Sequence, residues 1–310
     1  MFFSIVIPTY NRQPILEKCL KALEQQEFLV DPIAYEVVVV DDGSTDGTVA
    51  WLQANPSFPH VQLFKQDHQG AAAARNLGVE KAKGDMIIFI DSDLVVTEVF
   101  LQSHVNALLA GEKELGSDRL FTYGSVINTC NFADPTSEPF KITDYSRAYF
   151  ATGNVAIARK WLEQAGLFDT GFQLYGWEDL ELGVRLKKLG LKLIKCPEAV
   201  GYHWHPPFSL DQIDRLIDQE IQRGRMGVLF YQKHPTWNVR LMIQMTWLHR
   251  ILWGVLSLGG LLNERSLAPL LQWLIDQGKP QLALEIARIF LNWYNVKGVY
   301  AAYAERQQMN

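Results

Sequence analysis

The sequence predicts an α/β protein in which a mixed, mainly parallel sheet is flanked by helices and followed by a helical extension. Two observations support this fold class. Between residues 3 and 90, short apolar runs that are each long enough for one buried strand alternate with segments of helical spacing. Of the 310 residues, 48% are hydrophobic and 20% are charged, a composition that suits a chain folded throughout around a substantial core.

The alternation gives the expected elements in chain order. Runs of β-branched and aromatic residues indicate strands, and apolar residues spaced by three and four indicate helices. Pro8 ends the first strand because proline has no N–H for the ladder, and Gly84 is expected to end the third helix. The expected strands are residues 3–7, 35–40, 61–65 and 86–90, and the expected helices are residues 14–26, a short helix ending near 52, and 70–83.

Polar residues follow three of these strands, in Pro8-Thr9-Tyr10, Asp41-Asp42 and Asp91-Ser92-Asp93. The carboxyl ends of parallel strands lie at one edge of a sheet, where α/β proteins bind their ligands. If the fourth strand continues through Asp91 and Asp93, both carboxylates point to the same side and suit a divalent cation. The alternative is that Asp93 only caps a helix that begins near Thr97. Three polar strand ends at one edge favour the site.

The second half of the chain departs from this alternation. Residues 129–150 are irregular and rich in aromatic and polar residues, as in a binding loop. The other expected elements are a helix at 97–110, a strand at 120–128, a helix from 159, a helix opening at 175–181 and running to 189, a strand at 193–196 with a further extended segment before 202, and helices from 210 onward. We therefore expect an α/β domain at 1–208, with halves at about 1–95 and 96–208, and a helical extension at 209–310.

The formal net charge of −5 is unevenly distributed. Residues 1–208 contain 18 Lys and Arg against 26 Asp and Glu, a balance of −8, and residues 209–310 contain 11 against 8, a balance of +3. An acidic body argues against nucleic acid as a partner, since surfaces that follow phosphates need clustered Lys and Arg. It fits a protein that recruits a metal ion to meet a phosphate.

Cysteine spacing and hydropathy indicate a cytoplasmic protein. Cys19, Cys130 and Cys196 fit no disulfide or metal spacing, and neither a signal peptide nor a spanning helix is expected. Residues 238–262 combine aliphatic side chains with tryptophan and arginine, which suits a membrane interface. The alternative is an amphipathic helix packed on the α/β domain or on another subunit. The expected location is thus cytoplasmic, or peripheral at the cytoplasmic membrane face, with membrane or homo-oligomer contact through the C-terminal helices.

The order and spacing of several motifs resemble the family 2 glycosyltransferases of GT-A fold, over about residues 3–207. In the first half these are Pro8 through Arg12, Asp41 through Asp46, Gly70 through Asn76, and Asp91-Ser92-Asp93. The second half is similar to a segment of galactosyltransferases and chondroitin-polymerase-type transferases, in Gly153-Asn154, Phe168-Asp169 and Gly176-Trp177-Glu178-Asp179. One departure is that related transferases often have a Gly between the aromatic residue and the Glu-Asp pair.

The resemblance implies a nucleotide-diphosphate sugar across the strand ends, in a nucleotide-sugar half that precedes an acceptor half. The nucleotide-binding residues that it implies are Pro8, Tyr10, Arg12, Asp42, Arg75, Asp91 and Ser92. Asp93 and His203 would hold Mn²⁺ or Mg²⁺, with His205 as the competitor of His203, and an imidazole ligand favours Mn²⁺. Without the resemblance, Arg75 would be read as a solvated helix residue.

The acceptor side carries the implied catalytic group. Asp179 would be the general base, with Glu178 beside it as substrate ligand or alternate base, because an acceptor hydroxyl needs a carboxylate to remove its proton. Gly153, Asn154, Trp177 and Glu178 would bind substrate, Trp177 by stacking its indole on a sugar face. The alternative is that Glu178 and Asp179 only supply acids to a helix N-terminus.

These features predict a metal-dependent inverting glycosyltransferase that moves a sugar from a UDP-linked donor to a hydroxyl of a glycan or polysaccharide. Two alternatives stay open: a sugar nucleotidyltransferase, and a non-catalytic carbohydrate-binding or scaffold protein that keeps the fold. The first would usually have a basic, Gly-rich loop after the first strand, and residues 8–12 are not one. A dinucleotide-binding oxidoreductase is disfavoured because G-x-G-x-x-G is absent there.

Overall fold

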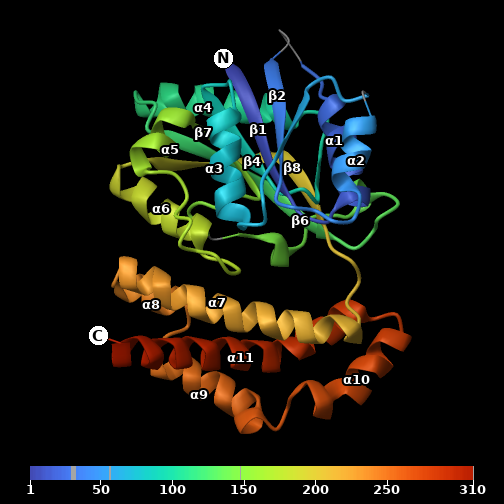
Figure 1. Ribbon diagram of the computed structural model, residues 1–310, viewed down its shortest axis with the longest axis vertical. Coiled ribbons are helices and arrows are strands. Elements are labelled where there is room, and N and C mark those ends of the chain that lie inside the picture. The colour runs from blue at the N-terminus through green and yellow to red at the C-terminus, as the bar shows by residue number, and fades with distance from the viewer. Residues whose placement is uncertain (29–32, 56, 147, 310) are drawn as a thin grey trace. The chain divides into compact units, whose positions relative to one another are not determined.

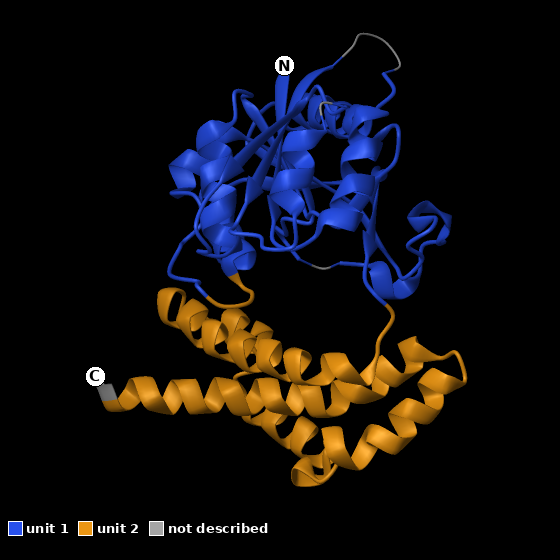
Figure 2. Ribbon diagram, turned by 45° about the vertical axis from the view of Figure 1, so that its right-hand side comes forward, with its two compact units in different colours: residues 1–173, 178–206 blue, residues 174–177, 207–310 orange. Residues whose placement is uncertain are grey.

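The structure is a computed structural model that describes the whole chain except residues 29–32, 56, 147 and 310 (Figure 1). It divides into two compact units (Figure 2). The first unit comprises residues 1–173 and 178–206 and contains the sheet. The second comprises residues 174–177 and 207–310 and is helical. The four residues 174–177 join the helical unit, although the sequence placed them in the α/β domain.

Eight strands of the described chain form one mixed sheet in the order β3-β2-β1-β4-β7-β6-β8-β5. The predicted fold class is confirmed. β1 to β4 are parallel, β7 runs antiparallel between β4 and β6, and β6 and β8 are parallel to each other. The strands are β1 Phe2–Thr9, β2 Ala34–Asp41, β3 Val61–Lys65, β4 Met86–Ile90, β5 Leu94–Val96, β6 Leu120–Thr129, β7 Asn154–Ala158 and β8 Lys192–Trp204.

Helices cover both faces of the sheet, because its central strands alternate buried apolar residues between two cores. Ile5 and Ile7 face the core that α1 and α4 share, whereas Val6 faces the core of α3, α5 and α6. The helices of this unit are α1 Gln13–Glu24, α2 Thr48–Ala54, α3 Ala71–Lys81, α4 Phe100–Leu115, α5 Arg159–Ala165 and α6 Glu178–Lys188, with 3₁₀ turns η1 Pro135–Ser137 and η2 Ile142–Asp144 in the loop after β6.

Two local expectations were wrong. The strand does not continue through Asp91 and Asp93: β4 ends at Ile90, the chain turns with the Leu94 N–H donating to the Asp91 carbonyl at 3.1 Å, and β5 follows. The next helix begins at Phe100 rather than near 97, so Asp93 does not cap it.

Gly84 also has a different role from the one expected. α3 ends at Lys81, and a Cβ on Gly84 would lie 2.6 Å from the Phe2 carbonyl oxygen and 2.8 Å from the Ser4 nitrogen. The glycine therefore permits close backbone approach to β1 and does not end the helix.

The second unit has its own apolar core between α7, α10 and α11. α7 and α11 approach closely at Gly224, where a Cβ would lie 2.7 Å from the Asn295 carbonyl oxygen. The elements of this unit are η3 Leu210–Gln212, α7 Ile213–Lys233, α8 Trp237–Met242, α9 Trp247–Leu256, η4 Leu258–Gly260, α10 Glu264–Asp276 and α11 Pro280–Met309. Among the described residues, the helices are all too short or too polar to cross a membrane.

A bulge sets the register between β6 and β8. Gly124 pairs with Cys196, but the next residue, Ser125, pairs with Val200, so residues 197–199 are extra residues in β8. At the bulge, the Asn154 amide donates to the carbonyls of Ser125 at 3.0 Å and Ala199 at 2.8 Å. A side chain at position 124 would overlap both this amide and the Ala199 carbonyl.

We therefore expect Gly124→Ala to destabilise the protein by about 2 kcal/mol or more, because rigid backbone and a buried amide would have to move. Urea unfolding followed by circular dichroism measures this. Gly254→Ala is the matched control, since its Cβ would meet Trp293 at an ordinary 3.6 Å and alanine favours a helix. Equal stability of the Gly124 variant and the wild type would refute the packing argument.

Candidate active site

The polar strand ends do meet at one edge of the sheet. Because β6 and β8 run in the same direction as β4, their carboxyl ends reach the edge where β1 to β4 end. β7 begins at this edge, since Asn154 pairs with Ile90. The first unit thus gathers side chains from both halves of its sequence at one edge.

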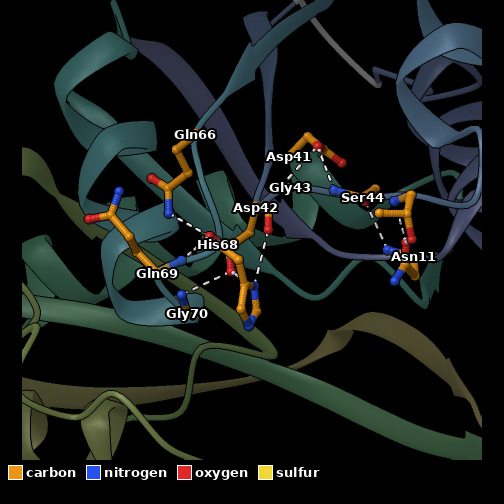
Figure 3. Close-up of polar contacts among 10 residues, drawn as sticks. Asn11, Asp41, Asp42, Gly43, Ser44, Gln66, His68, Gln69 and Gly70 are labelled. Carbon is orange, nitrogen blue, oxygen red and sulfur yellow. Dashed lines mark hydrogen bonds and ion pairs between the residues drawn. The ribbon is translucent and has the colours of Figure 1, made fainter.

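Asp42 is buried and organises the loop after β3 (Figure 3). Its carboxylate accepts hydrogen bonds from the backbone N–H groups of Gln69 at 2.8 Å and Gly70 at 2.9 Å, and from the Gln66 amide at 2.7 Å. The His68 Nδ1 lies 2.9 Å from the same carboxylate. Asp42 is therefore occupied by protein donors, and direct contact with a nucleotide stays a prediction.

Tyr10 stacks on His68, with ring centroids 4.5 Å apart and planes inclined by 28°. Pro8 lies within β1, two residues before Tyr10, and pairs with Val40 of β2. His68 is not among the predicted site residues, although it lies only three residues after Lys65, where β3 ends, and this position was a usable signal. Tyr10 is 44% exposed, so the stacked pair offers an aromatic surface at the sheet edge.

The loop after β1 is tied to the loop after β2. Asn11, which has a φ of 53°, donates its backbone N–H to the Ser44 hydroxyl at 2.8 Å and accepts from the Thr45 N–H at 2.7 Å (Figure 3). Asn tolerates this left-handed conformation better than most residues. The bonds hold both strand-end loops in one arrangement.

A buried arginine joins three distant segments of the first unit. Arg75 of α3 donates to the Asp91 carboxylate at 3.1 Å and to the Glu178 carboxylate at 2.9 Å. Burial lowers the pKa of Arg75, but Asp91 and Glu178 more than compensate and raise it, so the guanidinium stays charged. Its Nε is buried without a hydrogen-bond partner in the described chain. The reading of Arg75 as a solvated helix residue is wrong.

Asp179 lies at the start of α6 beside Glu178 and has a perturbed acidity. Burial, helped by the charge of Glu178, raises the pKa of Asp179 to about 7, while Arg75 opposes the shift. A carboxylate with this pKa binds and releases a proton near neutral pH, as a general base must. The helix-terminus alternative accounts for an acid at this position but not for a raised pKa.

Asp93, His203 and His205 form a candidate metal centre. One potential ligand atom from each lies within 4.8 Å of the others, and His203 Nε2 is 2.8 Å from Asp93 Oδ1. One carboxylate oxygen and two imidazole nitrogens suit Mn²⁺ better than Mg²⁺, which prefers oxygen ligands. The donor set therefore fits a divalent transition metal, and the structure brings both competing histidines to Asp93.

The charges around Asp93 favour its ionised form. Burial raises the pKa of Asp93, but the His203 hydrogen bond and the Arg12 guanidinium, 3.4 Å away, outweigh burial and lower it. Burial disfavours the His203 imidazolium, but Asp93 raises the pKa of His203 overall. Burial and the neighbouring His203 lower the pKa of His205 to about 4. A neutral His205 and an ionised Asp93 are the forms that bind metals.

The described contacts of the Asn154 side chain lie inside the protein, and its contact with a substrate stays a prediction. Asn154 is fully buried, its Nδ2 donates to two carbonyls at the bulge, and its Oδ1 lies 2.9 Å from His104 Nε2. The side chain is thereby used in the core. Gly153 and Ser92 lie closer to the polar edge: a Cβ on Gly153 would meet the Asp91 carboxylate at 3.3 Å, and Ser92 is buried next to Asp91.

Trp177 packs within the helical unit. Its indole N–H donates to the Arg223 carbonyl at 2.7 Å, and the Arg223 guanidinium lies 5.1 Å from the ring centroid. Its φ of 81° is unusual for a bulky residue. The ring therefore has packing partners in the second unit, and stacking on a sugar stays a prediction.

The sequence of this chain is similar to those of known proteins. The family model for glycosyl transferase family 2 matches residues 4–166. The chondroitin synthases of Escherichia coli and Pasteurella multocida are 32% and 30% identical over 255 residues, which is 70% of this chain in each case. The chain spans only 37% and 26% of the length of these two curated relatives.

Solved structures share the fold. The mannosyltransferase PcManGT from Pyrobaculum calidifontis, solved with GDP-Man and Mn²⁺, matches with a TM-score of 0.60 at 20% identity, covering 97% of this chain and 86% of that one. S. aureus TarS 1–349, solved with UDP, matches with a TM-score of 0.52 at 15% identity, covering 100% and 92%.

We expect Mn²⁺ to raise the melting temperature of the wild-type chain and to leave that of Asp93→Asn unchanged, because the variant loses the anionic ligand. At a hundredfold excess over the dissociation constant, the stabilisation is about 2.7 kcal/mol. Differential scanning fluorimetry with and without EDTA measures this. His203→Gln and His205→Gln separate the two imidazoles. Asp85→Asn, an exposed acid just before β4 at the opposite end of the strand, should respond as the wild type does. An equal Mn²⁺ response of Asp93→Asn would exclude this site.

Proposed function

Because this chain belongs to glycosyl transferase family 2 and has the GT-A fold, we propose that it transfers a sugar from a nucleotide-diphosphate donor, UDP-linked, to a hydroxyl of a glycan or polysaccharide. The proposed reaction is metal-dependent and inverts the anomeric centre. One observation carries the proposal: Asp179, with a pKa of about 7, lies in the same charge cluster as Arg75 and Asp91, at the sheet edge that also bears Asp93 and His203.

In the proposed reaction, Asp179 accepts the proton of the acceptor hydroxyl as its oxygen attacks the anomeric carbon. The new glycosidic C–O bond forms as the bond from that carbon to the diphosphate oxygen breaks, and the nucleoside diphosphate leaves with the electron pair. A single displacement of this kind inverts the configuration. The Glu178 carboxylate accepts a hydrogen bond from the Arg75 guanidinium at 2.9 Å. This ion pair occupies Glu178 and leaves Asp179 as the better base of the two.

Charge on the donor side supports nucleotide-diphosphate binding. Asp93 and His203 would hold a divalent ion, with His205 as a further ligand, and such an ion stabilises the negative charge of a leaving diphosphate. Arg12 is 39% exposed in its side chain and lies beside Asp93, within reach of an anion at the same edge. The buried Arg75 Nε is a donor still without a partner in the described chain.

The choice of UDP and of a glycan acceptor rests on similarity. The chondroitin synthases support a polysaccharide acceptor, and the TarS structure with UDP supports uridine. PcManGT was solved with GDP-Man, so the fold accommodates more than one base. A thermal-shift screen of UDP, GDP and their sugars with Mn²⁺ tests this choice. A larger shift with GDP-sugars than with UDP-sugars would contradict the assignment of UDP.

We expect Asp179→Asn to lower the transfer rate by about 10²–10⁴-fold while nucleotide and Mn²⁺ binding persist, because only the proton acceptor is lost. Initial rates and calorimetric titration with UDP measure the two quantities. Wild-type turnover by this variant would remove Asp179 as the base, and a wild-type chain that neither transfers nor slowly hydrolyses any donor would favour a non-catalytic carbohydrate-binding protein.

The pH profile gives a second test. The rate should rise as pH increases through about 7, because Asp179 must lose its proton to act as base. Glu178→Gln removes a neighbouring negative charge and should move this acidic limb to lower pH. An unmoved limb would show that another group titrates.

The raised pKa of Asp179 also makes stability depend on pH. The transfer rate should rise with pH, whereas the contribution of this group to stability falls. The folded-state pKa of Asp179 is raised from 3.8 to about 7, so the folded protein is destabilised by this group as pH rises through that window. Asp179→Asn should therefore melt above the wild-type temperature at pH values higher than about 7, with little difference near pH 4. Melting curves across this range measure it, and the same difference at both ends would contradict the assigned pKa.

A further inference from the structure

The helical unit has an exposed apolar surface that the proposed transfer reaction does not use. On α9, Trp247, Leu248, Ile251, Leu252, Val255 and Leu256 are each 43–66% exposed. Their spacing puts them on one helical face. A surface helix of a globular protein normally turns such a face inward, so α9 has the opposite orientation.

The surface extends beyond α9 along the sequence. In α8, Trp237 is 60% exposed, and after α9 the side chains of Leu258 and Leu261 are 58% and 73% exposed. We define the α8–α9 surface as Trp237, Leu241, Met242, Leu258, Leu261 and the six α9 residues above. Of the exposed large hydrophobic residues in the described chain, 11 of 25 lie in this 25-residue segment, 237–261. The six α9 residues share one side of the helix, and a contiguous exposed apolar face of this kind marks an interaction site.

The orientation of α9 is fixed by polar contacts on its other side. Thr246 caps the helix and lies 2.7 Å from His249 Nδ1, and the Trp253 indole donates to Gln244 at 2.6 Å. Gly254 allows α9 to pack against Trp293 of α11, beside which Figure 1 also shows it. The outward apolar face therefore belongs to a well-anchored helix.

The charge of the chain around α8 and α9 indicates which kind of partner this surface would bind. Residues 221–263 contain five Lys and Arg and no Asp or Glu. Arg240 lies in α8 and Arg250 in α9. Within the described chain, these two arginines contact aromatic rings and a carbonyl rather than carboxylates. Apolar residues with tryptophan and unpaired arginine are the composition of helices that lie in an anionic membrane interface. No described helix spans a membrane, so such contact would be peripheral.

We propose that the α8–α9 surface docks this chain onto the surface of an anionic phospholipid bilayer, with the α9 face in the interfacial layer and Arg240 and Arg250 near the lipid phosphates. A second copy of the chain is the competing occupant. It is disfavoured because two such surfaces would bring like charges together with no acid from residues 221–263 to pair with them.

Co-sedimentation of the purified chain with vesicles tests the proposal. Wild-type protein should bind vesicles of phosphatidylcholine with phosphatidylglycerol more tightly than vesicles of phosphatidylcholine alone. The triple variant Leu248→Ser, Ile251→Ser and Leu252→Ser should bind at least about tenfold more weakly, because apolar insertion is lost. Arg240→Gln and Arg250→Gln should each cost about fivefold on the anionic vesicles only.

The control is a matched triple variant of exposed apolar residues in the first unit, Val99→Ser, Leu109→Ser and Leu115→Ser, which should bind as the wild type does. Circular dichroism and light scattering without vesicles check folding and mass. The proposal is overturned if wild-type protein stays in the supernatant with anionic vesicles, or if the α9 triple variant binds equally. It is also overturned if wild-type protein is a dimer that this variant converts to a monomer. These readouts do not involve transfer activity, so they are independent of the proposed function.

Discussion

The ion pairs of Arg75 are the interaction on which the candidate active site depends. One buried guanidinium from α3 contacts Asp91 after β4 and Glu178 at the start of α6, and thereby joins parts of the sequence that lie 103 residues apart. Removing one partner of a buried pair typically costs roughly 3–5 kcal/mol, because a charge is left uncompensated. The same guanidinium opposes the rise in the pKa of Asp179, so it influences the proposed base as well as the loops around it.

A second buried network supports the same sheet edge from inside the core. His104 lies between Thr122 and Asn154, at 2.8 Å and 2.9 Å, and Asn154 in turn bridges the two strands at the bulge. Burial lowers the pKa of His104 to about 4, so the imidazole is neutral at ordinary pH. Since the folded-state value is depressed, the stability contributed by this network declines as pH falls below the ordinary histidine value of 6.5.

The parallel strands and the meeting of their polar ends could be predicted from the sequence. Apolar runs indicate strands locally, and alternation of strands with helices indicates that the strands are parallel. The sequence could not predict the turn at Asp91, since Leu94 to Val96 continue the apolar run and only pairing with β8 separates them. Motif position likewise could not show that Asn154 points into the core. For α9, composition predicted an amphipathic helix, but a hydrophobic pattern is the same whether its apolar face is covered or exposed.

The bulge in β8 has a consequence for how this family member can vary. With the register found before the bulge, Asn128 of β6 would face Val200, but the three extra residues bring His203 opposite it and opposite Leu94, next to Asp93. Because three is an odd number, the extra residues also reverse which side chains of β8 point to each face of the sheet. A short deletion within residues 197–199 would therefore move His203 away from Asp93 and disturb the candidate metal centre without replacing any of its residues.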